Sequence, residues 1–336
     1  MEIFTMLQFK HAPELKHQPA LRLVSTNELS RDDWLAVRKQ GIGSSDASAA
    51  VGINPYQSQL ELWLIKTGRD ANLPKPDFED ESLPTYWGNI LEPIVATHYM
   101  RRTNTKVRRI NAVLQHPTIP WMLANIDREV LGNPEVSILE CKTAGIFGSR
   151  LWKYGVPEYI QIQVQHQLAV TGKMAADVAV LLGGQELQIH RIERDDELIT
   201  QLITLEKRFW SFVESDTPPP ADGSESAGLS LQVLFPQDNG IAVNFKGDMN
   251  MNGVFSDWLD VREQLGALEK QELRYRQALQ QGMGEATRAE FEQGIVSWKK
   301  TKDSVILDTA AVLVVHPELL KKFPKPRNGS RRFVLI

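Results

Sequence analysis

The chain has 336 residues, of which 42% are hydrophobic and 24% charged, with a formal net charge of −4. This composition is ordinary for a soluble globular protein of one or two domains, and it excludes a globally basic nucleic-acid binder. No apolar run is long enough to span a membrane, and the N-terminus lacks the basic-then-apolar order of a signal peptide. The single cysteine, Cys141, excludes an intramolecular disulfide and a multi-cysteine zinc site, so we expect a cytoplasmic protein.

Basic residues cluster locally in two places, from Arg101 to Arg109 and from Lys321 to Arg332. A DNA enzyme can carry a negative net charge, because carboxylates gathered at a metal site offset the basic patches that hold phosphates. Each cluster alone is more typical of solvated surface. The net charge is therefore compatible with a DNA enzyme but does not predict one.

Helical patterns dominate the first third of the chain. Apolar spacing and capping residues predict helices in four segments: 30–39, 41–56 (a turn and a short helix), 58–69 and 85–103. Ser30 is the expected cap of the first helix, and Gly68 closes the third. Residues 1–25 show no clear period, and 70–84, rich in Pro, Asp and Glu, predict an exposed loop.

The pattern then changes to strands. Apolar runs bounded by turn residues predict five strands: 106–116, 119–130, 136–143, 174–184 and 185–194. Gly132-Asn133-Pro134 and Gly183-Gly184 mark the turns of two hairpins. Further helices are predicted over 157–172 and 195–215. This order predicts an α/β fold with one central sheet flanked by helices.

The best candidate for a domain boundary is 217–228, TPPPADGSESAG, because it is rich in Pro, Gly and Ser. It separates residues 1–216 from a C-terminal extension, 229–336. In the extension, 255–281 has the period of a helical hairpin arm or a coiled-coil-like segment. The remaining predicted elements are a hairpin over 294–309, a helix over 316–323 and a strand over 331–336. The extension is thus expected to be mainly helical, and its sequence indicates no role.

The stretch VSILECKT, residues 136–143, places a glutamate and a lysine in an otherwise apolar strand. Glu140 and Lys142 share one strand face, where either charge is costly unless it is paired or binds a metal ion. An ion pair at a strand end is one explanation. Another follows from Asp127, which a hairpin would bring beside Glu140, and from Glu92 in a preceding helix. Carboxylates gathered in this way predict a Mg²⁺ site, with Lys142 against a water or a phosphate oxygen.

Four motifs carry a resemblance to a known family. Asp127 followed by Glu140-Cys141-Lys142 resembles the PD-(D/E)xK nuclease pattern. Three further segments are similar, in the right order, to motifs of the lambda-exonuclease-like (YqaJ) viral recombinase family: 34–56, 88–100 and 158–172. The motifs cover roughly residues 30–215, and VSWKK with LDTAAVLVVHPELLKKF resembles the tail of longer members. The resemblance implies a restriction-endonuclease-like core, with a central mixed sheet flanked by helices.

The resemblance also implies a metal centre. Asp127 and Glu140 would bind the divalent ion, Mg²⁺ or Mn²⁺ in its place, helped by the main-chain carbonyl of Cys141. Glu92 would sit in the same cluster, through water or a second ion. The side chain of Cys141 points to the opposite strand face, so we interpret it as a small core residue.

Four more positions receive roles from the resemblance. Lys142 would orient or help to deprotonate the attacking water and stabilise charge on the phosphorane, and Gln163 would adjoin that lysine and water. Arg38 and Ser45 match the pair that grips the 5′-terminal phosphate. Taken alone, Arg38 is more typical of the basic end of a helix.

The sequence departs from the family pattern beside the metal site. Arg128 follows the aspartate, where members commonly have glycine, and Asn125 stands where a small hydroxyl residue helps to hold the phosphate. The implied activity is a metal-dependent 5′→3′ exonuclease on double-stranded DNA ends, of phage or prophage origin, which makes 3′ overhangs for recombination. A ring-shaped homo-oligomer, such as a trimer, and a single-strand annealing protein as partner are implied as well. The alternatives are an endonuclease with the same site and a DNA-end-binding protein without catalysis.

Overall fold

The computed structural model describes residues 19–27, 29–74, 79–326 and 329–336. The chain divides into two compact units, Met1–Pro236 and Gln237–Ile336, which are described separately. None of the helices in the described part of the chain combines the length and apolarity that crossing a bilayer requires.

The first unit begins with the predicted helical segments. Their bounds are α1 (Arg31–Lys39), the single turn η1 (Ser44–Asp46), α2 (Ala47–Ala50), α3 (Gln59–Lys66) and α4 (Pro84–Thr103). The Ser30 side chain accepts a hydrogen bond from the Asp33 N–H at 3.1 Å, as expected of a cap. Gly68 has a positive φ of 74°, which suits the residue that ends α3.

A five-stranded sheet forms the centre of this unit, in the order β2-β5-β6-β7-β8. The strands are β2 (Lys106–Arg108), β5 (Arg128–Leu131), β6 (Ile138–Ala144), β7 (Ala175–Leu182) and β8 (Glu186–Glu193). β6 and β7 are parallel, whereas the other neighbours are antiparallel. The expected central mixed sheet is thereby confirmed.

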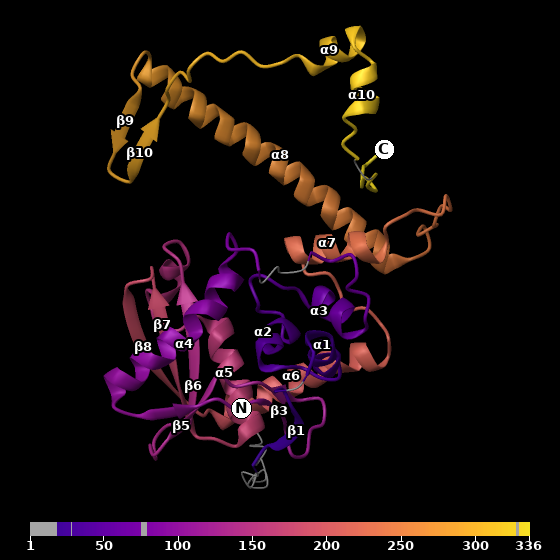
Figure 1. Cartoon of the computed structure of the whole chain (residues 1–336). Coiled ribbons are helices and arrows are strands. Elements are labelled where there is room, and N and C mark those ends of the chain that lie inside the picture. Colours follow the sequence, from indigo (N-terminus) through magenta and orange to yellow (C-terminus); the bar gives the residue numbers. More distant parts are fainter. Residues whose placement is uncertain (1–18, 28, 75–78, 327–328) are drawn as a thin grey trace, which may run out of the picture. The chain divides into compact units, whose positions relative to one another are not determined.

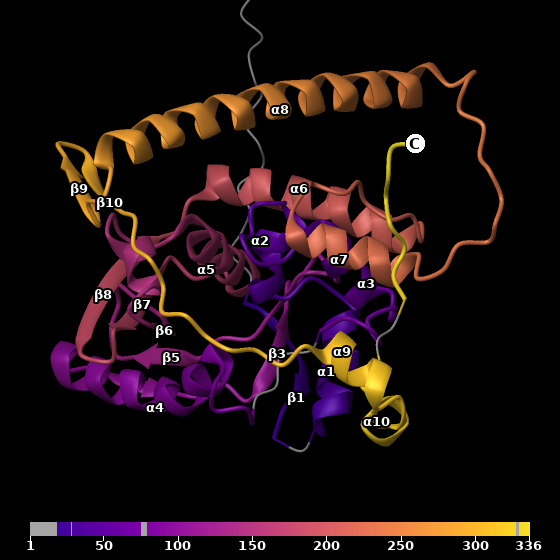
Figure 2. The ribbon, with the colours of Figure 1, turned by 90° about the horizontal axis from the view of Figure 1, so that it is seen from above.

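Helices cover both faces of the sheet (Figures 1 and 2). α4 packs on one face, where Leu139 lies in its apolar cluster, and α5 (Glu158–Thr171) packs on the other, with Ile138. α6 (Asp196–Glu214) packs against α5. Because side chains alternate along β6, neighbouring residues face different helices. Glu140 follows the pattern of Ile138 and therefore faces α5.

A second, three-stranded sheet was not predicted. It consists of β1 (Leu21–Ser25), β3 (Ala112–Gln115) and β4 (Leu123–Ala124), in the order β1-β3-β4. The predicted strands 106–116 and 119–130 are each divided between this sheet and the central sheet. The chain turns between β2 and β3, where the Ala112 N–H bonds to the Ile110 carbonyl at 2.9 Å.

The first unit ends later than the predicted boundary. Helix α7 (Glu225–Leu234) overlaps the expected linker 217–228 and packs against α3. The Ser226 hydroxyl donates to Glu61 at 2.6 Å and accepts from the Ser58 N–H at 2.8 Å. These bonds tie α7 to the start of α3, which is why the division falls after Pro236.

The second unit is mainly helical, as predicted. It contains α8 (Met249–Met283), the strands β9 (Arg288–Phe291) and β10 (Gly294–Ser297), α9 (Thr309–Val315) and α10 (Glu318–Lys322). The hairpin lies at 288–297 and not at 294–309, because β10 pairs with the preceding segment. The strand expected over 331–336 does not form, since no partner strand pairs with it among the described residues.

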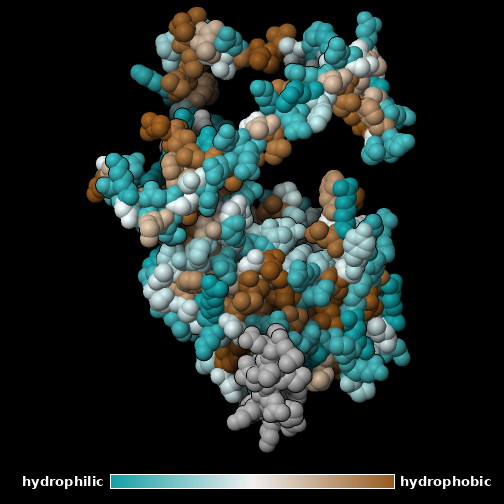
Figure 3. Space-filling view, turned by 180° about the vertical axis from the view of Figure 1, so that it is seen from behind, coloured by the Kyte–Doolittle hydropathy of each residue, from teal (hydrophilic) through white to brown (hydrophobic). Residues whose placement is uncertain are grey.

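Helix α8 contains no buried residue. Its exposed apolar side chains include Val254, Val261, Leu265, Leu268, Tyr275 and Leu279. They follow the 3-and-4 spacing of a coiled-coil seam, so α8 has the pattern of a helix that packs on another helix. The space-filling view in Figure 3 shows apolar side chains standing among hydrophilic ones on the surface.

Candidate active site

The β5–β6 hairpin gathers the charged residues of the central sheet. Arg128 pairs with Leu139 across the antiparallel strands, and the predicted turn at 132–134 connects them. Asp127 therefore lies beside the middle of β6, where its Oδ2 accepts a hydrogen bond from the Cys141 N–H at 2.8 Å. Glu140 and Lys142 project from β6 on the side covered by α5.

The carboxylate of Glu140 is only 3% exposed and is held by three side chains. Its Oε1 accepts from Lys142 Nζ at 2.7 Å and from Gln163 Nε2 at 2.6 Å, and its Oε2 accepts from Gln167 Nε2 at 2.7 Å. Gln163 Oε1 in turn accepts from Lys142 Nζ at 3.0 Å. Gln163 and Gln167 lie four residues apart on α5, so both point at the same strand. Gln167 was missed by the sequence reasoning, although this spacing within QVQHQ was a usable signal.

The electrostatics of this cluster favour a bound cation. Burial and the charge of Glu140 raise the pKa of Asp127 to about 8. Burial lowers the pKa of Lys142, but the charges of Glu140 and Asp127 outweigh it and raise that pKa overall. Two carboxylates thus share one ammonium, and a divalent ion would supply the missing positive charge.

The donor set fits a hard divalent ion. Among the described residues no group of three His, Cys, Asp or Glu side chains converges as a metal site, so the carboxylate ligands on offer are Asp127 and Glu140. Mg²⁺ is commonly held by one or two carboxylates, with waters and substrate phosphates completing its shell. The main-chain carbonyl of Cys141 stays a predicted third ligand. Its side chain is buried on the α4 face with Val95 and Tyr99, as expected of a core residue.

Glu92 approaches Asp127 from the other face of the sheet, with Arg128 Nη1 bonded both to its carboxylate and to the Asp127 carbonyl. It lies on α4, which covers the opposite face of the sheet, and its Oε1 accepts from Arg128 Nη1 at 2.5 Å and from Arg109 Nη2 at 3.4 Å. That Glu92 joins the cluster through water or a second ion stays a prediction. Arg128, where the sequence departs from the family pattern, binds this carboxylate through its guanidinium.

A second group of predicted residues does come together. Arg38, in the last turn of α1, donates from Nη2 to the Ser45 hydroxyl at 2.6 Å. The segment between them packs against β4: the Ile42 N–H donates to the Trp121 carbonyl at 2.7 Å. Gly41 is required there, since a Cβ would lie 2.5 Å from that carbonyl oxygen.

The same segment is linked to the strand that leads to Asp127. The Ser44 hydroxyl donates to the Asn125 carbonyl at 3.3 Å, and the Asn125 side chain donates to the Ala112 carbonyl at 3.3 Å. The Arg38–Ser45 pair is therefore anchored two residues before Asp127. In the structure, the side chain of Asn125 is used to join β3 to this strand.

Arg38 belongs to a buried ion cluster that the sequence did not reveal. Asp46 accepts from Arg38 at 2.8 Å, from Lys66 Nζ at 2.7 Å and from the Gly43 N–H at 3.0 Å. Burial raises the pKa of Asp46, but Arg38 and Lys66 outweigh it and hold the pKa below its usual range. A cavity of about 650 Å³ adjoins the cluster, and Arg38, Asp46 and Lys66 all contribute to its wall.

Replacing Asp46 by alanine should destabilise the first unit by about 3–5 kcal/mol at pH 7, because it leaves the buried Lys66 without its carboxylate. The folded-state pKa of Asp46 is lowered, so its contribution is present above the unfolded pKa and is lost as the pH falls. Urea unfolding at pH 7 measures the effect, with Asp216→Ala, in an exposed pair with Arg69, as the control. Equal midpoints for the two variants would contradict this account.

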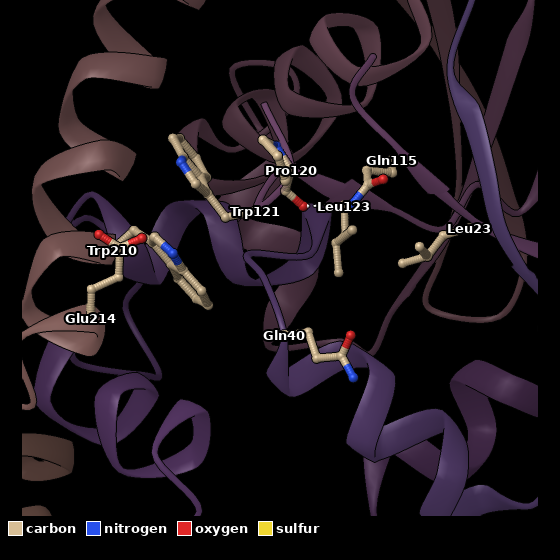
Figure 4. A pocket seen from close by; sticks show the side chains of 8 residues that line it. All are labelled: Leu23, Gln40, Gln115, Pro120, Trp121, Leu123, Trp210 and Glu214. Carbon is tan, nitrogen blue, oxygen red and sulfur yellow. Dashed lines mark hydrogen bonds between the residues drawn. The ribbon is translucent and has the colours of Figure 1, made fainter. Parts of the chain in front are cut away.

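Another cavity, of about 400 Å³, has a different character (Figure 4). It is lined by Leu23, Gln40, Gln115, Pro120, Trp121, Leu123, Trp210 and Glu214. The Gln115 amide donates to the Pro120 carbonyl at 2.8 Å. These eight residues include neither a predicted site residue nor a cation that could hold a phosphate.

Comparisons with known proteins agree with the sequence motifs. The YqaJ-like viral recombinase domain matches residues 33–174. The uncharacterized protein YqaJ of Bacillus subtilis (strain 168) is 35% identical over 314 residues, which cover 92% of this chain and 95% of that protein. An alkaline exonuclease, LHK-Exo, from Laribacter hongkongensis is 22% identical, with a TM-score of 0.45 over 55% of this chain and 93% of that chain. A phage-related exonuclease from Haemophilus somnus 129PT is 12% identical, with a TM-score of 0.38 over 55% of this chain and 99% of that chain. The chain thus belongs to the family of the YqaJ-like viral recombinase domain.

Proposed function

We propose that the chain is a Mg²⁺-dependent DNA exonuclease that degrades linear duplexes 5′→3′ and leaves 3′ overhangs for homologous recombination. The observation that carries this proposal is the cluster of Asp127, Glu140, Lys142 and Gln163 around one point of β6. Two carboxylates can hold a divalent ion, and a lysine and an amide can orient water and neutralise charge in metal-assisted phosphodiester hydrolysis. Membership of a viral recombinase family supports the link to DNA recombination.

Each protein group has a defined task in this mechanism. Asp127 and Glu140 would hold Mg²⁺, which would supply Lewis acidity to polarise the scissile phosphate and to lower the pKa of the attacking water. Lys142 neutralises charge that develops on the phosphate, and its ammonium is kept in position by Glu140 and Gln163. Gln167 fixes the other oxygen of Glu140, so that the carboxylate keeps one orientation.

Selection of DNA ends is assigned to Arg38 and Ser45. The two side chains are already in contact, and Asp46 accepts a hydrogen bond from the same guanidinium nitrogen, Nη2. A guanidinium and a hydroxyl together form charge-assisted hydrogen bonds with a terminal phosphate. The adjoining cavity offers room for the end of a strand.

Duplexes with 5′-phosphate ends should be degraded with an initial rate about tenfold to a hundredfold higher than duplexes with 5′-hydroxyl ends. Losing one charge-assisted bond costs about 1–3 kcal/mol, which corresponds to that ratio. Arg38→Ala should erase the preference by slowing only the phosphorylated substrate, whereas Arg69→Ala, an exposed arginine, should preserve it. Equal wild-type rates on both ends would remove the phosphate-binding role from Arg38.

The same carboxylates would also serve an endonuclease. The choice of DNA substrate therefore distinguishes an exonuclease from an endonuclease. The test is digestion of a linear duplex beside a covalently closed circle, each with Mg²⁺ and with chelator. An exonuclease degrades the linear duplex, spares the circle and stops in chelator. Cutting of the closed circle would replace the exonuclease with an endonuclease. DNA binding without any hydrolysis would indicate that the chain is an end-binding protein without catalytic activity.

We further propose a homo-oligomer and a single-strand annealing protein as partner, in the cytoplasm of a bacterium that carries phage or prophage DNA. The exposed coiled-coil spacing on α8 supports association through helices. Light scattering of the full chain measures the oligomer, and a ring such as a trimer is the expected form.

A further inference from the structure

Arg128 is an unusual neighbour for a metal site. Its side chain is only 8% exposed, and its Nη1 donates both to Glu92 Oε1 at 2.5 Å and to the Asp127 carbonyl at 2.6 Å. A cation is therefore buried between a carboxylate and the main chain of a predicted metal ligand. Buried charges of this kind require partners, and here both partners belong to the candidate site.

Strand alternation explains how the guanidinium reaches this place. Arg128 stands opposite Leu139, whose side chain packs toward α4, so Arg128 faces α4 as well. Glu92 projects from α4 to meet it. Asp127, one residue earlier, is directed to β6, where it meets the Cys141 N–H. The hairpin thus places the Asp127 carboxylate beside β6 and the Arg128 guanidinium on the face of the sheet that α4 covers.

The charges of the cluster indicate how many metal ions it can accept. Glu92, Asp127 and Glu140 carry three negative charges when ionised. Lys142, Arg128 and Arg109, the last 3.4 Å from Glu92, supply three positive charges. One divalent ion would give this otherwise neutral cluster two positive charges, which one phosphodiester would reduce to one. A second divalent ion would add two more positive charges beside the Arg128 guanidinium, which already forms an ion pair with Glu92.

We propose that the guanidinium of Arg128 takes the place of a second divalent ion, so that the chain works with one metal ion held by Asp127 and Glu140. Arg128 is then a positioning residue: it neutralises Glu92 and fixes the main chain that carries Asp127. The inference rests on the proposed metal-dependent function and narrows it from a two-ion to a one-ion mechanism.

Titration calorimetry with Mn²⁺ on the full chain tests the inference without reference to activity. The wild type should bind one ion, and Glu92→Gln should still bind one, because Glu92 is not a ligand. Arg128→Gln should bind two, since Glu92 becomes available, and Glu92→Gln combined with Arg128→Gln should return to one. Arg108→Gln removes an arginine that pairs with Glu129, and as the matched control it should bind one ion. Circular dichroism checks that each variant is folded.

The Mn²⁺ dependence of DNA hydrolysis gives a second readout. Its Hill coefficient should rise from about 1 in the wild type to a value between about 1 and 2 in Arg128→Gln, because hydrolysis with two ions depends on both binding steps. Two ions in the wild type, or fewer ions in Glu92→Gln than in the wild type, would overturn the inference and leave the nuclease intact. A single ion in folded Arg128→Gln would overturn it as well. A wild type that binds no Mn²⁺ would overturn the metal-dependent function and the inference together.

Discussion

Asp127→Asn is expected to abolish DNA hydrolysis in Mg²⁺ while the protein stays folded. The asparagine keeps an oxygen that can accept the Cys141 N–H bond but loses the charge that binds the ion. Burial and Glu140 raise the pKa of Asp127 to about 8, so the ionised carboxylate is costly in the metal-free protein. The measurement is nucleotide release from a linear duplex, together with thermal unfolding in chelator.

The pH dependence of stability provides the control for this variant. Because the folded-state pKa of Asp127 is raised, its contribution to stability is present below the unfolded pKa and is lost as the pH rises toward 8. The metal-free wild type should therefore lose stability between about pH 4 and 8 more steeply than Asp127→Asn. Hydrolysis by a folded Asp127→Asn variant would refute the site assignment.

Glu140 calls for a different expectation, because its carboxylate is an acceptor for Lys142, Gln163 and Gln167. Glu140→Ala should also abolish hydrolysis, but it leaves three donors without their acceptor. A loss of activity in Glu140→Ala is therefore interpreted only together with the stability of that variant. A loss of activity in folded Asp127→Asn can be attributed to the missing charge.

Lys142→Ala is expected to slow hydrolysis by about two to four orders of magnitude, the range for proton-transfer and electrostatic contributions. Glu140 keeps its bonds to the two glutamines in this variant, so the carboxylate should stay in place. Single-turnover rates at saturating DNA measure the effect, and binding in Ca²⁺ should persist. Lys153→Ala, an exposed lysine, is the control. A variant that binds DNA poorly but cuts normally at saturation would make Lys142 a phosphate anchor.

Much of the candidate site could be predicted because it lies on one hairpin. Asp127, Glu140 and Lys142 are close in sequence, and the turn residues and the strand period place them together without knowledge of the rest of the fold. The position of Gln163 came from the family resemblance. Its contact with Lys142 depends on how α5 packs over the sheet, which is tertiary information.

The residues that were missed are those whose partners are distant in the sequence. Asp46 binds Lys66 from another helix, and Arg128 binds Glu92 from α4, so neither contact has a local signature. The division of residues 106–116 between two sheets has a similar cause, because strand patterns show where a chain is extended but not which sheet it joins. In the second unit, the pattern at 331–336 suits a strand that finds no partner among the described residues.

The central claim is that the Asp127–Glu140–Lys142 cluster hydrolyses DNA with a divalent ion. Its most direct test is nucleotide release from a 5′-phosphorylated linear duplex by the full chain in Mg²⁺, in Ca²⁺ and in chelator, beside Asp127→Asn. We predict release by the wild type in Mg²⁺, and none by Asp127→Asn or in chelator. Release in chelator, or equal release by wild type and Asp127→Asn in Mg²⁺, would contradict the claim.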